Sequence, residues 1–149
     1  MAKIKAVCFD MDGVLIEAKD WHYEALNKAL RLFGMEISRY EHIHVFDGLP
    51  TKQKLEIIGK RFYLPESLRP FINELKQNFT MDFVAEFCHP CFTQEYALSR
   101  LKSEGYKIAV CSNSIRHTIE VMMERSGLKR YLDLIVSNED VEKQIGRAS

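Results

Sequence analysis

Two acidic residues one position apart, Asp10 and Asp12, are the first side chains here whose types and spacing could do chemistry. They follow a short apolar run, Ile4–Phe9, which is typical of a buried strand, and the carboxyl end of such a strand is where open α/β sheets bind ligands. One carboxylate could attack an electrophile such as phosphorus while the other moves protons. The two charges repel unless a hard cation such as Mg²⁺ lies between them. The alternative is ordinary turn chemistry, in which Asp10 caps a turn and Asp12-Gly13 forms it.

A hydroxyl residue, Ser112, ends a second apolar segment, Lys107–Cys111, that also predicts a buried strand. The next helix would open just behind it. A small hydroxyl beside the free N–H groups of a helix start can bind an anion. The alternative is that Ser112 is a plain helix N-cap.

The four cysteines are Cys8, Cys88, Cys91 and Cys111. Cys8 and Cys111 fall in predicted strands, where cysteine usually acts as a small buried hydrophobe. Cys88-His89-Pro90-Cys91 has C-x-x-C spacing, so zinc or redox chemistry must be weighed. No second cysteine pair is present, and His89 lies between the two cysteines rather than at a ligand spacing beyond them. A reduced, cytoplasmic protein is therefore expected.

Helical periodicity dominates the segment after the first strand. It predicts helices over residues 20–33, 52–62, 68–78 and 81–87, with a connection or short helix at 38–46. No strand is predicted between residues 16 and 88. A helical module therefore separates the first strand from the rest of the sheet.

Regular alternation returns after Pro90. The pattern predicts a helix ending at Gly105, a strand at 107–111, a helix capped by Ser114 and closed by Gly127, and a strand at 134–136. Strand and helix in alternation indicate an α/β fold with a parallel sheet and right-handed crossovers.

The composition limits the classes of molecule that the chain is expected to bind. The chain has 149 residues, 46% of them hydrophobic, and its 21 basic and 21 acidic residues give a formal net charge of zero. Nothing in this balance points to nucleic acid or to an anionic membrane. No apolar run reaches the ~20 residues that a membrane helix needs, and the N-terminus has no signal-peptide pattern.

The stretch Phe9-Asp10-Met11-Asp12-Gly13-Val14-Leu15 resembles the first motif of the haloacid dehalogenase superfamily, in its phosphatase and phosphomutase branch. The resemblance implies that Asp10 is a nucleophile that becomes an aspartyl-phosphate and that Asp12 is the general acid and base. It also implies that Asp10 and the backbone carbonyl of Asp12 bind Mg²⁺. Since the dehalogenase and phosphonatase branches lack an acid at the second position, Asp12 favours phosphoryl chemistry.

Val110-Cys111-Ser112-Asn113-Ser114 resembles the second motif of that family. By this resemblance the Ser112 hydroxyl and the Asn113 backbone N–H bind the transferring phosphoryl group.

The resemblance also implies the domain organisation. Residues 1–15 and 89–149 would form a three-layer Rossmann-like core, incomplete here, and residues 16–88 an inserted α-helical cap. In the cap, His22 takes the place of a histidine in the beta-phosphoglucomutase-like branch, although a lone helical histidine is usually a surface or packing residue. Lys52 could reach a substrate phosphate, although exposed lysines are usually only solvated. The segment Asp47–Thr51 lacks the basic loop of the mutases, which favours a simple phosphatase.

Two further motifs of the family are not found before Ser149. The lysine of the third motif is expected near position 145, where Ile145 stands, with Lys143 close by, and the acidic pair of the fourth motif is absent. The first strand would then form an exposed edge through which the chain could self-associate.

We therefore expect a Mg²⁺-dependent phosphatase-like hydrolase of a small phosphorylated metabolite. The alternatives are a sugar-phosphate mutase, or a non-catalytic truncated fragment that acts as an interaction protein.

Overall fold

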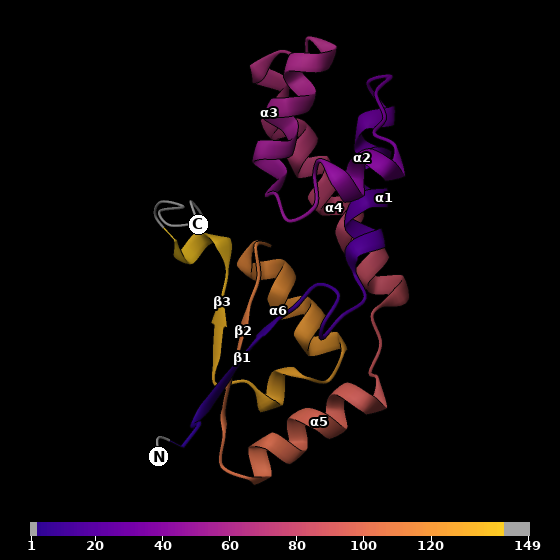
Figure 1. Cartoon of the computed structure of the whole chain (residues 1–149). Coiled ribbons are helices and arrows are strands. Elements are labelled where there is room, and N and C mark those ends of the chain that lie inside the picture. The colour runs from indigo at the N-terminus through magenta and orange to yellow at the C-terminus, as the bar shows by residue number, and fades with distance from the viewer. Residues whose placement is uncertain (1–2, 142–149) are drawn as a thin grey trace. The chain divides into compact units, whose positions relative to one another are not determined.

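The computed structural model describes residues 3–141 of the chain. The chain divides into two compact units (Figure 1). We call residues 1–17 with 88–149 the core unit, and residues 18–87 the helical unit. The α/β class expected from the sequence is confirmed, because the core unit holds a parallel sheet and the other unit is helical.

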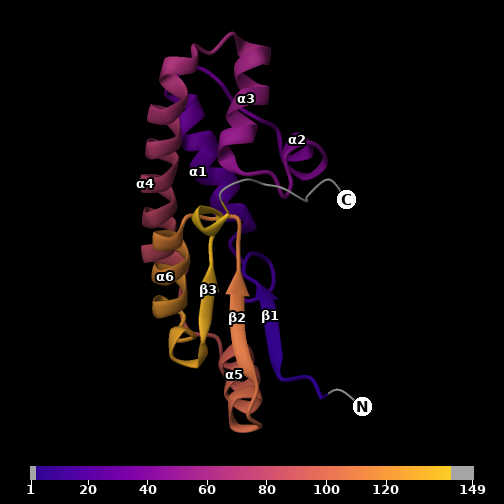
Figure 2. The same ribbon diagram turned by 90° about the vertical axis from the view of Figure 1, so that its left-hand side faces the viewer.

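The sheet of the core unit has three parallel strands. These are β1 (Ala6–Asp10), β2 (Lys107–Cys111) and β3 (Leu134–Val136), in the order β1-β2-β3 (Figure 2). Asp10 lies opposite Cys111, and Cys111 lies opposite Val136. The carboxyl ends of all three strands therefore meet along one edge of the sheet.

One face of this sheet is packed by helices. Helices α5 (Phe92–Ser103) and α6 (Arg116–Arg125) lie on the same side of the strands in Figure 1. The side chains of Ile108 and Val110 in β2 are fully buried. Burial of alternate residues along β2 is what a sheet covered on one face predicts.

The expectation of a buried first strand is wrong. β1 pairs with β2 alone among the described residues, and Ala6, Cys8 and Asp10 are exposed. The strand also starts two residues later than Ile4, which is 73% exposed. The apolar run identified a strand, but burial depended on neighbours that the run itself does not contain.

Short turns connect the core elements. Gly105 and Gly127 adopt positive φ, as expected where helices end. Two 3₁₀ turns, Lys129–Tyr131 and Asn138–Asp140, flank β3. The prediction that Ser114 caps α6 is wrong, because Ile115 occupies the N-cap position and makes no side-chain hydrogen bond there.

The helical unit contains α1 (Lys19–Arg31), α2 (Arg39–His44), α3 (Thr51–Phe62), the 3₁₀ turn Glu66–Leu68, and α4 (Arg69–Phe87). Its buried core draws on α1, α3 and α4 and on the segments that connect the helices: Tyr23, Leu26, Ala29, Leu30, Met35, Ile37, Phe46, Leu55, Ile58, Leu64 and Ile72. The helix α4 is one continuous element, whereas the sequence predicted two helices. No breaker interrupts it, and the buried Thr80 hydroxyl donates to the Lys76 carbonyl at 2.8 Å within the helix.

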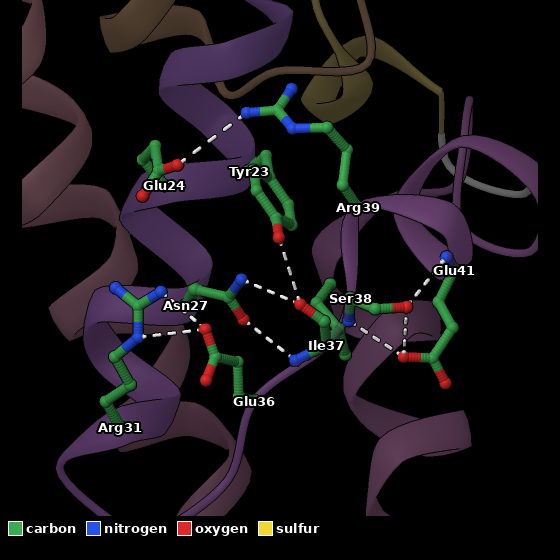
Figure 3. Close-up of polar contacts among 9 residues, drawn as sticks. All are labelled: Tyr23, Glu24, Asn27, Arg31, Glu36, Ile37, Ser38, Arg39 and Glu41. Atoms are coloured by element: carbon green, nitrogen blue, oxygen red, sulfur yellow. Dashed lines mark hydrogen bonds and ion pairs between the residues drawn. The ribbon is translucent and has the colours of Figure 1, made fainter.

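A buried asparagine joins α1 to the segment before α2 (Figure 3). The Asn27 amide accepts from the backbone N–H of Ile37 and donates to its carbonyl, both at 2.9 Å. The Tyr23 hydroxyl donates to the same carbonyl at 3.2 Å. A capping box between Ser38 and Glu41 then starts α2. No helix within residues 3–141 is both long and apolar enough to cross a membrane.

Candidate active site

The first half of the site is the end of β1. Asp10 is the last residue of the strand and is exposed. Its Oδ1 accepts a hydrogen bond from the backbone N–H of Met11 at 2.8 Å. This bond fixes the carboxylate and leaves Oδ2 as the oxygen better placed to act on a ligand.

A tight loop follows Asp10. The carbonyl of the fully buried Met11 accepts from the N–H groups of Val14, Leu15 and Ile16 at 3.0–3.2 Å. Gly13 adopts φ +79°, which glycine reaches without steric cost, and its N–H donates to Ile16 at 2.7 Å. Asp12 is therefore held within a backbone turn that its own neighbours close.

The end of β2 supplies the second half. Ser112 follows Cys111, which lies opposite Asp10, so the two predicted site residues fall on adjacent strand ends. The Ser112 N–H donates to Val136 at 3.0 Å, which ties the residue to β3. Its Oγ accepts from the Ser114 N–H at 3.1 Å, so the hydroxyl hydrogen is left to donate elsewhere. Asn113, the next residue, is half-buried.

An ion pair after β3 was not predicted from the sequence. Arg116, at the start of α6, donates to the Asp140 carboxylate at 2.6 Å and to the Ile135 carbonyl at 3.1 Å. The Arg116 hydrogen bond, with further bonds from the Ser137 N–H and hydroxyl, lowers the pKa of Asp140 to about 2. The feature of the sequence that could have indicated this pair is a basic residue four positions after Ser112. The pair fixes the loop after β3.

Cys8 and Cys111 meet on the exposed face of the sheet. Their sulfur atoms are 2.8 Å apart. The expectation of two buried cysteines is wrong for Cys8, which is exposed, and Cys111 is half-buried. Burial, and then the contact with Cys8, raise the pKa of the Cys111 thiol to about 11.

The C-x-x-C cysteines behave differently. Cys88 is buried, and its thiol lies 3.5 Å from the Met122 carbonyl, to which it donates. Burial raises the pKa of Cys88. Cys91 is exposed. The packing of Cys88 against α6 gives it a structural role.

The two predicted cap residues lie in the helical unit. His22 is on α1, and its Nδ1 is 3.2 Å from the Nζ of Lys76 on α4. Lys76 is only 6% exposed and was missed from the sequence. The sequence could have indicated its burial, because Lys76 lies four residues from each of the buried Ile72 and Thr80 on the same helix. Lys52 is exposed in the first turn of α3.

The oxygen atoms of the two candidate metal ligands are of the type that Mg²⁺ prefers. Asp10 and Asp12 offer hard oxygen atoms, and Mg²⁺ commonly binds proteins through one or two carboxylates while substrate phosphate and water complete its shell. Residues 3–141 hold no group of three or more histidine, cysteine or acidic side chains arranged to bind a metal. Lys143 and Ile145, where the third motif was expected, lie outside the described residues.

Comparison with known proteins identifies the family. Residues 7–144 match the haloacid dehalogenase-like hydrolases. The chain belongs to this family. A haloacid dehalogenase-like relative, the phosphoglycolate phosphatase of Aquifex aeolicus, is 27% identical over 136 residues, covering 91% of this chain and 62% of the relative. The phosphorylated carbohydrates phosphatase of Thermotoga maritima is 25% identical, covering 93% and 63%.

Solved structures show the same fold. The beta-phosphoglucomutase of Clostridium difficile is 24% identical with a TM-score of 0.78, covering 95% of this chain and 65% of that protein. The chain thus spans less than two thirds of the length of these haloacid dehalogenase-like proteins.

Proposed function

We propose that this chain carries the phosphoryl-transfer site of a Mg²⁺-dependent phosphatase that acts on a small phosphorylated metabolite. The observation that carries the proposal is the register of β1 and β2. It sets Asp10 opposite Cys111, the residue directly before Ser112, and so supports a site shared by these two strand ends. Matches to phosphatases at 25–27% identity support the same class of reaction.

The proposed reaction has two steps. Asp10 Oδ2 attacks phosphorus, the bond to the leaving oxygen breaks, and Asp12 donates a proton to that oxygen. Asp12 then accepts a proton from a water molecule, which attacks the aspartyl-phosphate and releases inorganic phosphate and the free Asp10 carboxylate. The Met11 N–H holds one oxygen of the Asp10 carboxylate, and the backbone bonds of Met11 and Gly13 fix the turn that carries Asp12.

The phosphate-binding groups are the Ser112 hydroxyl and the Asn113 backbone N–H. Ser112 is fixed by its bonds to Val136 and Ser114, so its hydroxyl needs little reordering to donate to a phosphoryl oxygen. Mg²⁺, held by Asp10 and the Asp12 carbonyl oxygen, would supply positive charge against the anionic phosphate.

The helical unit would supply substrate contacts as a cap. The half-buried His22 and the buried Lys76 form a basic pair that would meet a hydroxyl or anionic group of the substrate, and Lys52 is a second candidate. The Lys76→Met variant tests the pair, because it keeps the volume of the side chain and removes its charge. A rise in KM with little change in kcat is expected if the pair binds substrate.

The test of the chemistry is Asp10→Asn in the full chain, with Asp82→Asn on the exposed surface of α4 as the matched control. Hydrolysis of para-nitrophenyl phosphate with Mg²⁺ should fall at least ~1,000-fold in the first variant and stay unchanged in the second. Backbone amide signals of Ser112 and Asn113 should shift when Mg²⁺ and inorganic phosphate are added to the wild-type chain. Full activity of Asp10→Asn, or a wild-type chain with neither turnover nor these shifts, would show the proposal to be wrong.

Two other functions follow from particular observations. The first is a sugar-phosphate mutase, because a beta-phosphoglucomutase is among the structural matches. A hexose product that retains its phosphate group would support a mutase, whereas release of inorganic phosphate would support a phosphatase. The unpaired outer edge of β1 in the described sheet favours self-association as a second, non-catalytic function.

A further inference from the structure

We propose that Cys8 and Cys111 are an oxidation site, at which hydrogen peroxide converts the two thiols into an intrachain disulfide. Their sulfur atoms lie 2.8 Å apart in the reduced chain. The two residues belong to neighbouring strands, so their meeting is a product of the fold and not of sequence proximity. This inference does not depend on the hydrolase activity.

The oxidant can reach the pair. Cys8 is exposed on the edge strand, and Ala6 beside it on the same face is exposed as well. The helices α5 and α6 lie against the opposite face, on which Ile108 and Val110 are buried. Neither of these helices stands between Cys8 and solvent.

The chemistry balances with peroxide alone. The Cys8 sulfur attacks the O–O bond, which breaks to release one water and leave a sulfenic acid on Cys8. The Cys111 sulfur then attacks the Cys8 sulfur, the S–S bond forms, and the S–O bond breaks to release a second water. Two thiols lose two hydrogen atoms, and one peroxide molecule is reduced to two water molecules.

The bond would act on the proposed phosphoryl site. Cys8 lies opposite Ala109, whereas Cys111 lies opposite Asp10, so the two cysteines are diagonal neighbours in the ladder. A disulfide bond is about 2.05 Å long, so the two sulfur atoms must move closer together when it forms. Because Cys111 lies opposite Asp10 and directly precedes Ser112, we expect the bond to act on the strand ends that carry these two residues.

The other cysteine pair provides an internal comparison. Cys88 and Cys91 are closer in sequence, yet Cys88 is buried and its thiol is engaged with the Met122 carbonyl. Peroxide should leave this pair reduced under conditions that link Cys8 to Cys111.

The experiment treats the full chain with hydrogen peroxide and maps the products by mass spectrometry. We expect the loss of two hydrogen atoms from the intact mass and one linked peptide pair containing Cys8 and Cys111, both reversed by dithiothreitol. The link should be absent from Cys8→Ser and Cys111→Ser and present in the control Cys91→Ser. A Cys88–Cys91 link, a link between two chains, or only irreversible sulfinic and sulfonic acids would overturn the proposal.

The effect on the site has its own readout. Amide signals of Asp10 and Ser112 should move on oxidation of the wild-type chain and stay in place in peroxide-treated Cys8→Ser. If the chain hydrolyses phosphate esters, oxidation should lower its turnover about 100-fold, the scale on which small displacements of catalytic groups act. Oxidation that forms the link but leaves these amide signals unmoved would overturn the part of the inference that concerns the site.

Discussion

Asp10 lies directly opposite Cys111 in the ladder that joins β1 to β2. The two residues are far apart in the sequence, and their pairing places the acidic loop after β1 beside the hydroxyl that follows β2. Everything proposed for the phosphoryl site depends on this pairing.

The Ser112 hydroxyl gives the first prediction. Removing a hydrogen bond to a charged group typically costs about 1.5–3 kcal/mol, so Ser112→Ala should lower kcat/KM roughly 10- to 100-fold. Ser112→Thr keeps the hydroxyl and should retain most of the activity. Ser99→Ala, at a half-buried position of α5 whose hydroxyl donates to the Tyr96 carbonyl, is the control and should leave kcat/KM unchanged. Equal losses in Ser112→Ala and Ser112→Thr would show that the hydroxyl does not bind the phosphoryl group.

The hydrogen bonds between the Asn27 side chain and the backbone of Ile37 give a prediction about stability. Asn27→Ala removes both hydrogen bonds to Ile37 and leaves the buried N–H of Ile37 without its Asn27 acceptor. The free energy of unfolding should therefore fall by about 2–4 kcal/mol. Tyr23→Phe removes one bond and should cost about 0.5–1.5 kcal/mol.

Urea titration followed by the fluorescence of Trp21 measures this change, because the single tryptophan of the chain lies on α1 in the helical unit. The exposed Asn78→Ala on α4 is the matched control, with an expected change within about 0.5 kcal/mol. A change in Asn27→Ala no larger than in this control would contradict the prediction.

The pair of Arg116 and Asp140 gives a dependence on pH. The pKa of Asp140 is lowered from 3.8 to about 2 in the folded chain, first by the Arg116 hydrogen bond and then by Ser137. The charged carboxylate therefore favours the folded state above pH 3.8, and this contribution is lost as the pH falls toward 2.

Arg116→Gln should raise the pKa of Asp140 toward its ordinary value, as measured by NMR titration of the side-chain carboxyl. Asp133 is the internal control, because Lys102 and the Ile108 N–H lower its pKa and neither is changed in this variant. An unchanged pKa of Asp140 would mean that the bonds from Ser137 are sufficient to hold it low.

The edge of β1 gives a prediction about assembly. We expect the chain to self-associate along this strand, with the concentration dependence measured by analytical ultracentrifugation. Cys8→Lys places a charge on the exposed strand and should shift the equilibrium toward the monomer. Phe92→Lys replaces an apolar side chain that is 79% exposed on α5 and should leave the equilibrium unchanged. A wild-type chain that stays monomeric at all concentrations would contradict the expectation.

The sequence by itself determined the local features. Short apolar runs that end in polar residues identified the strands, and the acids after β1 and the serine after β2 identified the candidate site. Alternation of strand and helix was enough to predict a parallel sheet, because each of these patterns is complete within a few consecutive residues.

The tertiary structure decided what depends on distant partners. The exposure of Cys8, its contact with Cys111, and the meeting of His22 with Lys76 all join residues from separate elements. Thr80, which lies where the sequence predicted a break between two helices, is fully buried within the continuous helix α4. Periodicity shows which face of an element is apolar, but it does not contain the register or the neighbour that determines whether the face is buried.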